Sequence, residues 1–414
     1  MKKIILGFFL VAGSVSVNAQ SLKDINTYVT IRSYAKAKPM VDKFLADPKN
    51  ANNAEAWYYK GTIYNMLSHD STQAANAAAY RAEAFNAYKK SQELDASDKF
   101  LKGENYIPYL DLYYSYYQNG ADQFNAKNYD ASYSAFKNAL DVHDYIVAKN
   151  YTYKDANISR LDTALVLNTG VAAMQAKKND ESITYFNQII NAGVNSASYE
   201  DVYNTVITHY RTTGDNAKLV ATLAKARAAY PSNPYWNEVE LDILKKSGDK
   251  KALFAKYEEF TNANPQDFAT LYNYAVELFN TIYASDADAK KVAETGATTE
   301  KLTSVLNKAI AADKDITGTV LMANHQFNLA YNINDLVTAA KDPKKKADLK
   351  AQFMKQVDVT IPYAEKVITY YDGLSTLTGG QKATYNQQIN HLVDFYKLKN
   401  NTAKANMYNA KLKK

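Results

Sequence analysis

Histidine is the side chain that most often binds metals or transfers protons near neutral pH. The chain has five histidines, and none has a second histidine three or four residues away. A zinc site on a helix needs two such ligands on one helix face. The spacing therefore favours surface or packing roles and predicts no metal site. The five are His69, His143, His209, His325 and His391.

Two pairs of carboxylates could, by residue type, cleave a glycosidic bond. Glu258 adjoins Glu259, and Glu238 lies two residues before Glu240. A glycosidase holds its two carboxyl groups about 5 to 9 Å apart across a cleft, and adjacency in sequence does not show that geometry. The surrounding Lys and Glu are typical of the solvated face of an amphipathic helix. The chain also lacks a phosphate-binding Gly-rich loop and a Gly-x-Ser-x-Gly elbow. We therefore predict no enzyme activity and no cofactor.

Tyrosine is unusually frequent, with 35 residues. Five of them lie close together before Gly120. A strand is disfavoured there, because alternation with a period of two fails at both Tyr-Tyr pairs. In a helix the cluster divides by spacing into three core residues and two residues, three apart, that are candidates for ligand contact. The expected core residues are Tyr109, Tyr113 and Tyr116, and the candidates for contact are Tyr114 and Tyr117.

Length and composition favour a large helical protein. The chain has 414 residues, of which 47% are hydrophobic, but only 14 glycines and 8 prolines. An all-β protein with many hairpins would need more of these turn residues. The net charge of +6 falls to +4 without Lys2 and Lys3, because residues 1–19 contain no acid. The basic runs at 344–346 and 411–414 are interpreted as a solvated helix start and tail, so no nucleic acid partner is predicted.

The first residues have the pattern of a secretory signal peptide. Lys2 and Lys3 precede a short apolar run, and Val17 and Ala19 suit a cleavage site before Gln20. We therefore expect residues 1–19 to be removed and the protein to be exported, either periplasmic or secreted. Without cysteine there is no disulfide and no lipid-modified cysteine, so a lipoprotein is not expected. No later segment is long and apolar enough to span a membrane.

An internal repeat is the clearest signal for the fold. Gly214-Asp215 recurs as Gly248-Asp249, and Pro231 recurs as Pro265, so both the turn and the terminator repeat with a period of 34 residues. That is the period of tetratricopeptide repeats (TPR). The pattern predicts pairs of helices that expose an apolar face and must stack on one another to cover it.

Other segments carry matching residues. "AEAWYYKGTIY" contains Trp57, Gly61 and Tyr64, and "AFNAYKKSQELD" contains Tyr88. On these residues and the 34-residue period, the chain resembles the TPR family, and in particular exported TPR proteins of Gram-negative bacteria. The resemblance implies an all-α fold, a right-handed α-solenoid of stacked helix-turn-helix repeats over residues 20–414. We expect seven to nine helix pairs, with insertions near 66–80, 283–300 and 335–358.

The resemblance also implies a function. We expect a non-catalytic scaffold in the cell envelope that binds a protein or peptide partner in a concave groove formed by the first helix of each pair. For the aromatic residues among the expected groove residues named below, packing against the next repeat is the alternative to ligand contact. Carbohydrate capture is a second hypothesis, because Tyr and Trp also stack on sugars, and a helical-barrel hydrolase with a buried carboxylate pair is a third. The expected groove residues are Tyr58, Thr62, Tyr114, Tyr117, Asn204, Thr208, Arg211, Tyr272 and Phe279.

Overall fold

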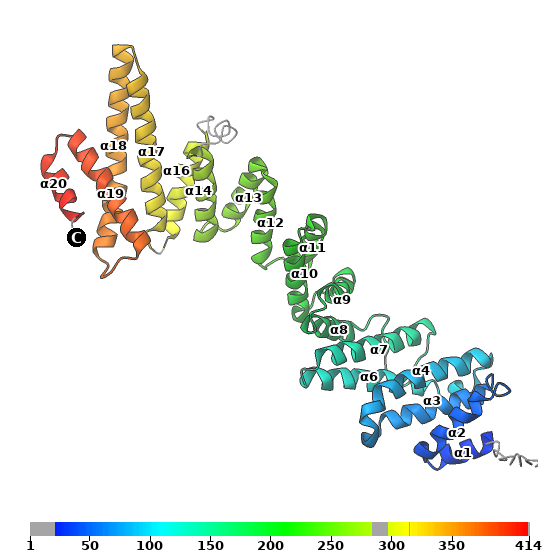
Figure 1. Cartoon of the computed structure of the whole chain (residues 1–414). Coiled ribbons are helices and arrows are strands. Elements are labelled where there is room, and N and C mark those ends of the chain that lie inside the picture. Colours follow the sequence, from blue (N-terminus) through cyan, green and yellow to red (C-terminus); the bar gives the residue numbers. More distant parts are fainter. Residues whose placement is uncertain (1–20, 284–296, 314, 413–414) are drawn as a thin grey trace, which may run out of the picture. The chain divides into compact units, whose positions relative to one another are not determined.

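The computed structural model describes residues 21–283, 297–313 and 315–412, and within these ranges the chain is helical with no strand. The helices fall into two compact units that meet in sequence at Asn233 and Pro234 (Figure 1). The expected signal peptide and most of the expected insertion at 283–300 lie outside the described residues.

The first unit contains eleven α-helices and two short 3-10 helices among its described residues. They are α1 (Leu22–Thr30), α2 (Tyr34–Ala46), α3 (Ala54–Ser68), η1 (Ser71–Asn76), α4 (Ala77–Leu94), α5 (Lys99–Gly103), α6 (Ile107–Asn125), α7 (Tyr129–Ala148), α8 (Thr163–Gln175), α9 (Asn179–Asn191), η2 (Ala197–Tyr199), α10 (Glu200–Thr213) and α11 (Asn216–Ala229). Helix α3 packs mainly on α4, α6 on α7, α8 on α9 and α10 on α11. These are the helix pairs that the repeat predicts.

The second unit continues with helix pairs. It contains α12 (Tyr235–Ser247), α13 (Lys250–Ala263), α14 (Phe268–Tyr283), α16 (Ala297–Ala312), α17 (Thr317–Ala339), α18 (Pro343–Asp372), α19 (Gly379–Leu398) and α20 (Thr402–Lys411). Helices α17 and α18 are the longest, with 23 and 30 residues. The expected insertion at 335–358 therefore extends two helices. The expected insertion at 66–80 comprises the end of α3, all of η1 and the start of α4.

The recurring Gly-Asp dipeptide forms the turn inside a helix pair. Gly214 and Gly248 both have a φ of +76°, a left-handed conformation that glycine adopts without a steric penalty. The aspartate that follows each glycine caps the next helix. Asp215 accepts a hydrogen bond from the backbone N–H of Lys218 at 3.1 Å, and Asp249 accepts one from Ala252 at 2.9 Å. The two residues thus end one helix and begin the other, as the 34-residue repeat predicts.

Close contact between a glycine and an aromatic ring joins the two helices of three pairs. A Cβ atom added to Gly61 would lie 2.4 Å from the ring of Tyr88, and one added to Gly120 would lie 2.6 Å from Phe136. Gly170 has the same relation to Phe186, at 2.5 Å. Real Cβ atoms do not come so close, so only glycine lets the first helix rest on the ring of the second.

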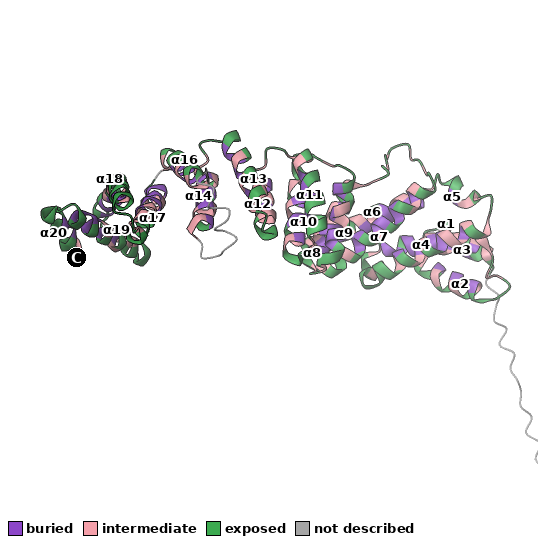
Figure 2. Ribbon diagram, turned by 90° about the horizontal axis from the view of Figure 1, so that it is seen from above, coloured by how far each residue is buried: buried purple, intermediate pink, exposed green. Residues whose placement is uncertain are grey.

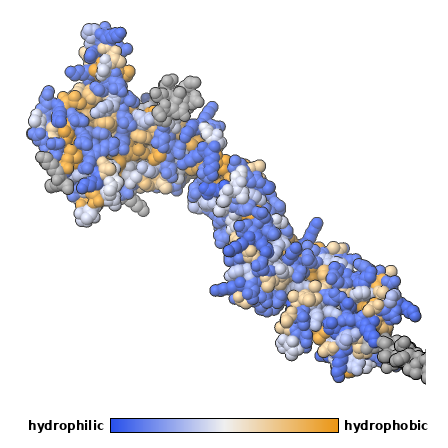
Figure 3. All heavy atoms as spheres, in the orientation of Figure 1, coloured by the Kyte–Doolittle hydropathy of each residue, from blue (hydrophilic) through white to orange (hydrophobic). Residues whose placement is uncertain are grey.

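The tyrosine run lies in α6 and divides as the helix spacing predicts. Tyr109, Tyr113 and Tyr116 are buried, at 0%, 7% and 3% exposure, whereas Tyr114 is 51% exposed. Figure 2 shows buried residues along the inner faces of α6 and its neighbours. Figure 3 shows mostly hydrophilic side chains on the visible surface, with scattered hydrophobic ones. The three core tyrosines therefore contribute to packing within the first unit.

Replacing Gly120 by alanine should destabilise the first unit by about 2 kcal/mol, because the new methyl group would overlap the ring of Phe136. Adding Phe136→Leu to Gly120→Ala should recover part of that loss in urea unfolding. Gly103→Ala is the matched control, since nothing lies within 4 Å of its added Cβ. Equal effects of the two single substitutions would show that the ring contact is unimportant.

Acid should weaken the second unit through two histidines, of which His325 is buried and His391 half-buried. Burial lowers the pKa of His325 to about 4 and that of His391 to about 4. His325 is fully buried, with its ring nitrogens 2.8 Å and 2.9 Å from the hydroxyls of Tyr283 and Thr303. Because the folded-state pKa lies below the unfolded value of about 6.5, the unfolded chain binds the proton more readily. The stabilisation is complete above pH 6.5 and is lost as the pH falls towards 4, by up to roughly 3 kcal/mol for His325.

The measurement is urea unfolding at pH 7 and pH 4.5 in a Trp57→Phe chain, where fluorescence reports on Trp236, which is fully buried in the second unit. Adding His325→Gln should lower stability at pH 7 but make it less sensitive to pH. A pH dependence unchanged by His325→Gln would contradict this assignment.

Candidate binding groove

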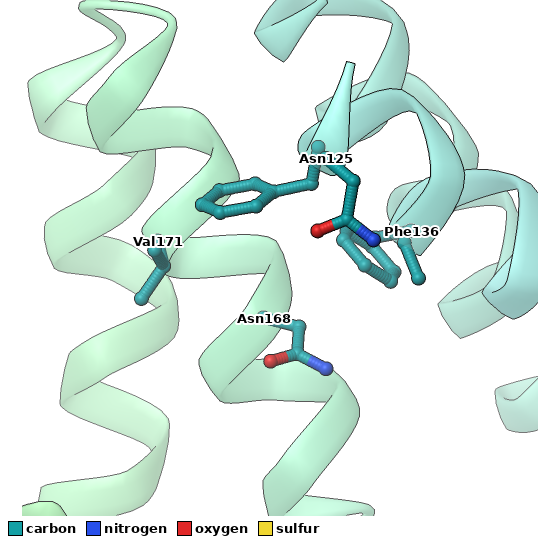
Figure 4. A pocket seen from close by; sticks show the side chains of 6 residues that line it. Asn125, Phe136, Asn168 and Val171 are labelled. Carbon is teal, nitrogen blue, oxygen red and sulfur yellow. The ribbon is translucent and has the colours of Figure 1, made fainter. Parts of the chain in front are cut away.

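A cleft of about 190 Å³ lies between the first helices of two neighbouring pairs, α6 and α8. Ala121, Phe124 and Asn125 line it from α6, Asn168 and Val171 from α8, and Phe136 of α7 lines it from the second helix of the first pair. Figure 4 shows Asn168 and Val171 on one helix, across from Asn125 and Phe136. We call this space the α6–α8 cleft.

One carboxylate fixes the start of α8 beside α6. Asp162 caps α8 by accepting a hydrogen bond from the backbone N–H of Leu165 at 2.9 Å. The hydroxyl of Tyr113, in α6, donates to the same side chain. Burial, together with this carboxylate, raises the pKa of Tyr113 well above its ordinary value, so the phenol remains a donor at all physiological pH values. The position of the cleft thus depends on a side chain buried in α6.

Tyr117, an expected groove residue, lies beside this cleft and bridges the two pairs. The amide of Asn168 donates a hydrogen bond to its hydroxyl at 3.0 Å. Its ring meets the edge of Phe136 at a centroid distance of 5.7 Å. Tyr117 is half-buried, so packing against the next repeat accounts for part of its surface.

Tyr117 belongs to a stripe of four residues along one side of α6. Tyr114, Tyr117, Ala121 and Phe124 follow one another at intervals of three or four residues, which places them on one helix face. Tyr114, at one end, is exposed and contacts the ring of Tyr113 at a centroid distance of 5.0 Å. We call these four residues the α6 stripe.

The expected groove residues of α3 lie in a different environment. The short helix α5 covers Tyr58. The ring of Tyr58 stacks on that of Phe100, with 5.5 Å between the ring centroids, and the hydroxyl of Tyr58 donates a hydrogen bond to Glu104. Thr62 is half-buried, and its hydroxyl donates to the carbonyl of Tyr58, one turn back in the same helix, at 3.2 Å. The chain itself therefore contacts this part of α3.

The remaining expected residues lie on two other first helices. Asn204, Thr208 and Arg211 follow each other on one face of α10 at intervals of four and three residues. Tyr272 and Phe279 lie in α14 of the second unit, where Phe279 packs against the core beside Tyr283, at a centroid distance of 4.7 Å. Of the whole set, Tyr117 contacts two residues that line the α6–α8 cleft, Asn168 and Phe136, and Tyr114 lies one turn farther along α6.

None of the six residues that line the cleft was predicted from the sequence as a groove residue: Ala121, Phe124, Asn125, Phe136, Asn168 and Val171. Phe124 could have been found, because it lies seven residues beyond Tyr117 and so on the same helix face. Asn168 and Val171 flank Gly170, and nothing in their local pattern indicates which residues of α6 face them. That pairing depends on how neighbouring helix pairs pack.

A polar network centred on Gln92 holds the segments around α5 and the loop after α7. Its side-chain oxygen accepts hydrogen bonds from the hydroxyls of Tyr109 and Tyr145, and its nitrogen donates to Asp98 and Tyr151, both at 2.6 Å. Each of these polar atoms is thereby satisfied inside a cluster of tyrosine rings.

Among the described residues, no group of three or more His, Cys, Asp or Glu side chains is placed to hold a metal ion. In the same part of the chain, no helix has the length and apolar character needed to cross a membrane.

Three alanine substitutions in α6 should separate packing from contact. Tyr116→Ala should cost about 3 to 5 kcal/mol, because it removes a buried aromatic ring, whereas exposed Tyr114→Ala should cost less than about 0.5 kcal/mol. Tyr117→Ala should fall between them, since its ring is half-buried and bridges to Asn168. Urea unfolding measures all three. A loss at Tyr114 as large as that at Tyr116 would refute the division of the tyrosine run.

Solved structures similar to this chain include two that are described as TPR proteins. A TPR repeats protein from Bacteroides fragilis is 17% identical, with a TM-score of 0.27, and the match covers 67% of this chain and 97% of that one. The TPR domain of P58(IPK) is 12% identical, with a TM-score of 0.27, over 90% of this chain and 97% of that domain. A chain of the APC/C hetero-tetramer Cut9–Hcn1 is 13% identical, with a TM-score of 0.21, over 95% of this chain and 87% of that one.

No protein-family model matches the chain, and no curated protein matches it in sequence. With TM-scores below 0.5, these matches carry no argument about this chain by themselves. The chain's own helix pairs, its 34-residue period and the close contact of glycine with an aromatic ring provide the independent argument. The chain therefore has the tetratricopeptide repeat fold, an all-α helical-repeat fold of the solenoid type.

Proposed function

We propose that this protein is an exported, non-catalytic TPR scaffold that binds a protein or peptide partner in the cell envelope. The binding face is formed by the first helices of the pairs, and the α6–α8 cleft is one subsite on it. The observation that carries the proposal is this cleft, in which apolar Phe124 and Val171 are accompanied by the amides of Asn125 and Asn168.

The chemistry of the cleft suits an extended peptide. A volume of about 190 Å³ can hold one large apolar side chain, since a cavity of about 150 Å³ accommodates benzene. Side-chain amides both donate and accept hydrogen bonds, as a peptide backbone does. The donor of Asn168 is engaged by Tyr117, which leaves its oxygen as an acceptor for a peptide N–H.

The α6 stripe sets the length of the peptide segment that would be bound. Tyr114 to Phe124 spans ten residues of helix, or about 15 Å at 1.5 Å per residue. An extended peptide covers that length with about five residues at 3.3 Å each. We therefore propose a short linear segment as the bound element, with one apolar side chain in the cleft and its neighbours along Tyr114 and Tyr117.

Export supports an envelope partner. The proposal of export rests on the amino-terminal pattern of Lys2, Lys3, a short apolar run and Ala19, together with the absence of cysteine. A scaffold exported in this way would meet envelope or extracellular proteins.

A charge placed in the cleft should weaken peptide binding. Peptides would be selected from a random display library on the wild-type chain, and their affinities measured by fluorescence anisotropy. Val171→Arg should reduce affinity at least about tenfold, or about 1.4 kcal/mol, because the new side chain fills the apolar part of the cleft.

The matched control is Val220→Arg, which places the same change on an exposed valine of α11, a second helix of the same unit. It should leave the affinity within about twofold, since isolated surface changes have small effects. If every selected peptide bound wild type and Val171→Arg equally well, the α6–α8 cleft would not be the binding site.

A further inference from the structure

Arg81, in α4, is a buried cation that lacks a bound carboxylate. The side chain is only 8% exposed. Its Nε donates a hydrogen bond to the hydroxyl of Ser115 at 2.6 Å, but its Nη1 is buried with no hydrogen-bond partner. Buried charges in proteins are normally paired, and buried donors are normally bonded. The guanidinium therefore has an unfilled requirement for an acceptor.

Asp111, an acid that influences Arg81, does not fill that requirement. Asp111 influences Arg81 only through space. Its carboxylate instead accepts a hydrogen bond from the amide of Asn65 at 2.7 Å and lies 3.1 Å from Nε2 of His69. Burial lowers the pKa of Arg81 below its ordinary value, while Tyr116 and Asp111 favour the charged form. Because arginine is not deprotonated in proteins, the group keeps its charge.

A cavity of about 210 Å³ opens beside this side chain. Arg81 and Tyr116 line it, with the guanidinium 5.9 Å from the centre of the Tyr116 ring. Ala78, at the start of α4, and Ala135, in α7, contribute methyl groups, and other alanines continue that apolar wall. Side-chain amides come from Asn119 in α6 and Asn138 in α7. We call this space the Arg81 cavity.

We propose that the Arg81 cavity binds a small free monocarboxylate with a short apolar chain. One carboxylate oxygen accepts from the free nitrogen of Arg81, and the other lies near the amides of Asn119 and Asn138. The apolar chain lies against the alanines. A hydrogen bond from a guanidinium to a carboxylate is assisted by both charges and is about twice as strong as one between neutral groups.

The size and charge of the cavity select this class of ligand. Because a cavity of about 150 Å³ holds the six carbons of benzene, about 210 Å³ suits a ligand of six to eight heavy atoms. A phosphate dianion carries a second negative charge, which the single guanidinium in the cavity lining would leave unpaired. Asp111, which influences Arg81 through space, would repel that dianion more strongly than it repels a monocarboxylate.

The site is distinct from the peptide groove. Tyr116, Asn119 and Gln123 of α6 face the Arg81 cavity, whereas Ala121, Phe124 and Asn125 face α8. The second helices α4 and α7 complete the Arg81 cavity. Binding at one site can therefore be tested without altering side chains of the other.

The test uses sodium butyrate as the probe and the full-length folded chain, with affinity measured by isothermal titration calorimetry at constant ionic strength. Wild type should bind one butyrate with a Kd in the millimolar range, roughly 1 mM, as expected for a six-atom ligand. Butyramide should bind at least about tenfold more weakly, because it lacks the charge that Arg81 pairs with.

Two variants locate the site, each with a matched control. Arg81→Gln removes the charge, and Ala78→Phe fills the cavity while keeping Arg81; both should weaken butyrate binding at least about tenfold. Arg160→Gln changes an exposed arginine of the same unit, and Ala79→Phe changes the residue next to Ala78 in α4, which does not line the cavity. These matched controls should leave the Kd within about twofold. Val171→Arg, in the peptide cleft, should do the same.

Circular dichroism is used to check that each variant is folded. If Arg81→Gln is not folded, Ala78→Phe still tests the proposal. Three results would overturn the proposal: no saturable butyrate binding to wild type, equal binding of butyramide, or butyrate binding unchanged by Ala78→Phe. Inorganic phosphate binding as tightly as butyrate would show a general anion site and would also overturn it. A peptide with a free C-terminal carboxylate that displaced butyrate, and bound at least tenfold more tightly, would contradict a free acid as the ligand.

Discussion

The close approach of a glycine backbone to an aromatic ring is the contact on which the helix pairs depend. At Gly61, Gly120 and Gly170 the first helix lies so near a ring of the second that no side chain fits between them. A ring packed in this way fills the space between two helices at the density of a protein interior. The remaining face of the first helix is then free to meet the next pair, or a ligand, because its inner face is already covered.

Polar side chains then connect one pair to the next. Asp162 accepts from both the backbone of α8 and Tyr113 of α6, and Gln92 satisfies tyrosines from α6, α7 and the loop after α7. Such buried networks specify geometry because each unsatisfied member would be costly. They explain why a chain so rich in tyrosine can bury many of these rings: the hydroxyl groups find acceptors on neighbouring elements. The α6–α8 cleft is a consequence of this arrangement.

Features set by local geometry could be predicted from the sequence. The Gly-Asp turns, the helix pairs and the division of the tyrosine run into buried and exposed residues all follow from backbone conformation and the helical period. Features set by packing between pairs could not. The segment that follows α5, which covers Tyr58, has left-handed backbone at Asn105 and Tyr106, with φ of 51° and 58°. Asparagine adopts this conformation readily, but a tyrosine gives no signal for it. Asn168 beside Tyr117, and the unpaired guanidinium of Arg81, likewise arise from residues far apart in sequence.

A crystal structure of the chain with a selected peptide tests the central claim, that first helices form the binding face, most directly. We predict an extended segment along the α6 stripe, with an apolar side chain between Phe124 and Val171 and a backbone hydrogen bond to Asn168. A peptide bound instead on the second helices α7 and α9, with the α6–α8 cleft empty, would contradict that claim.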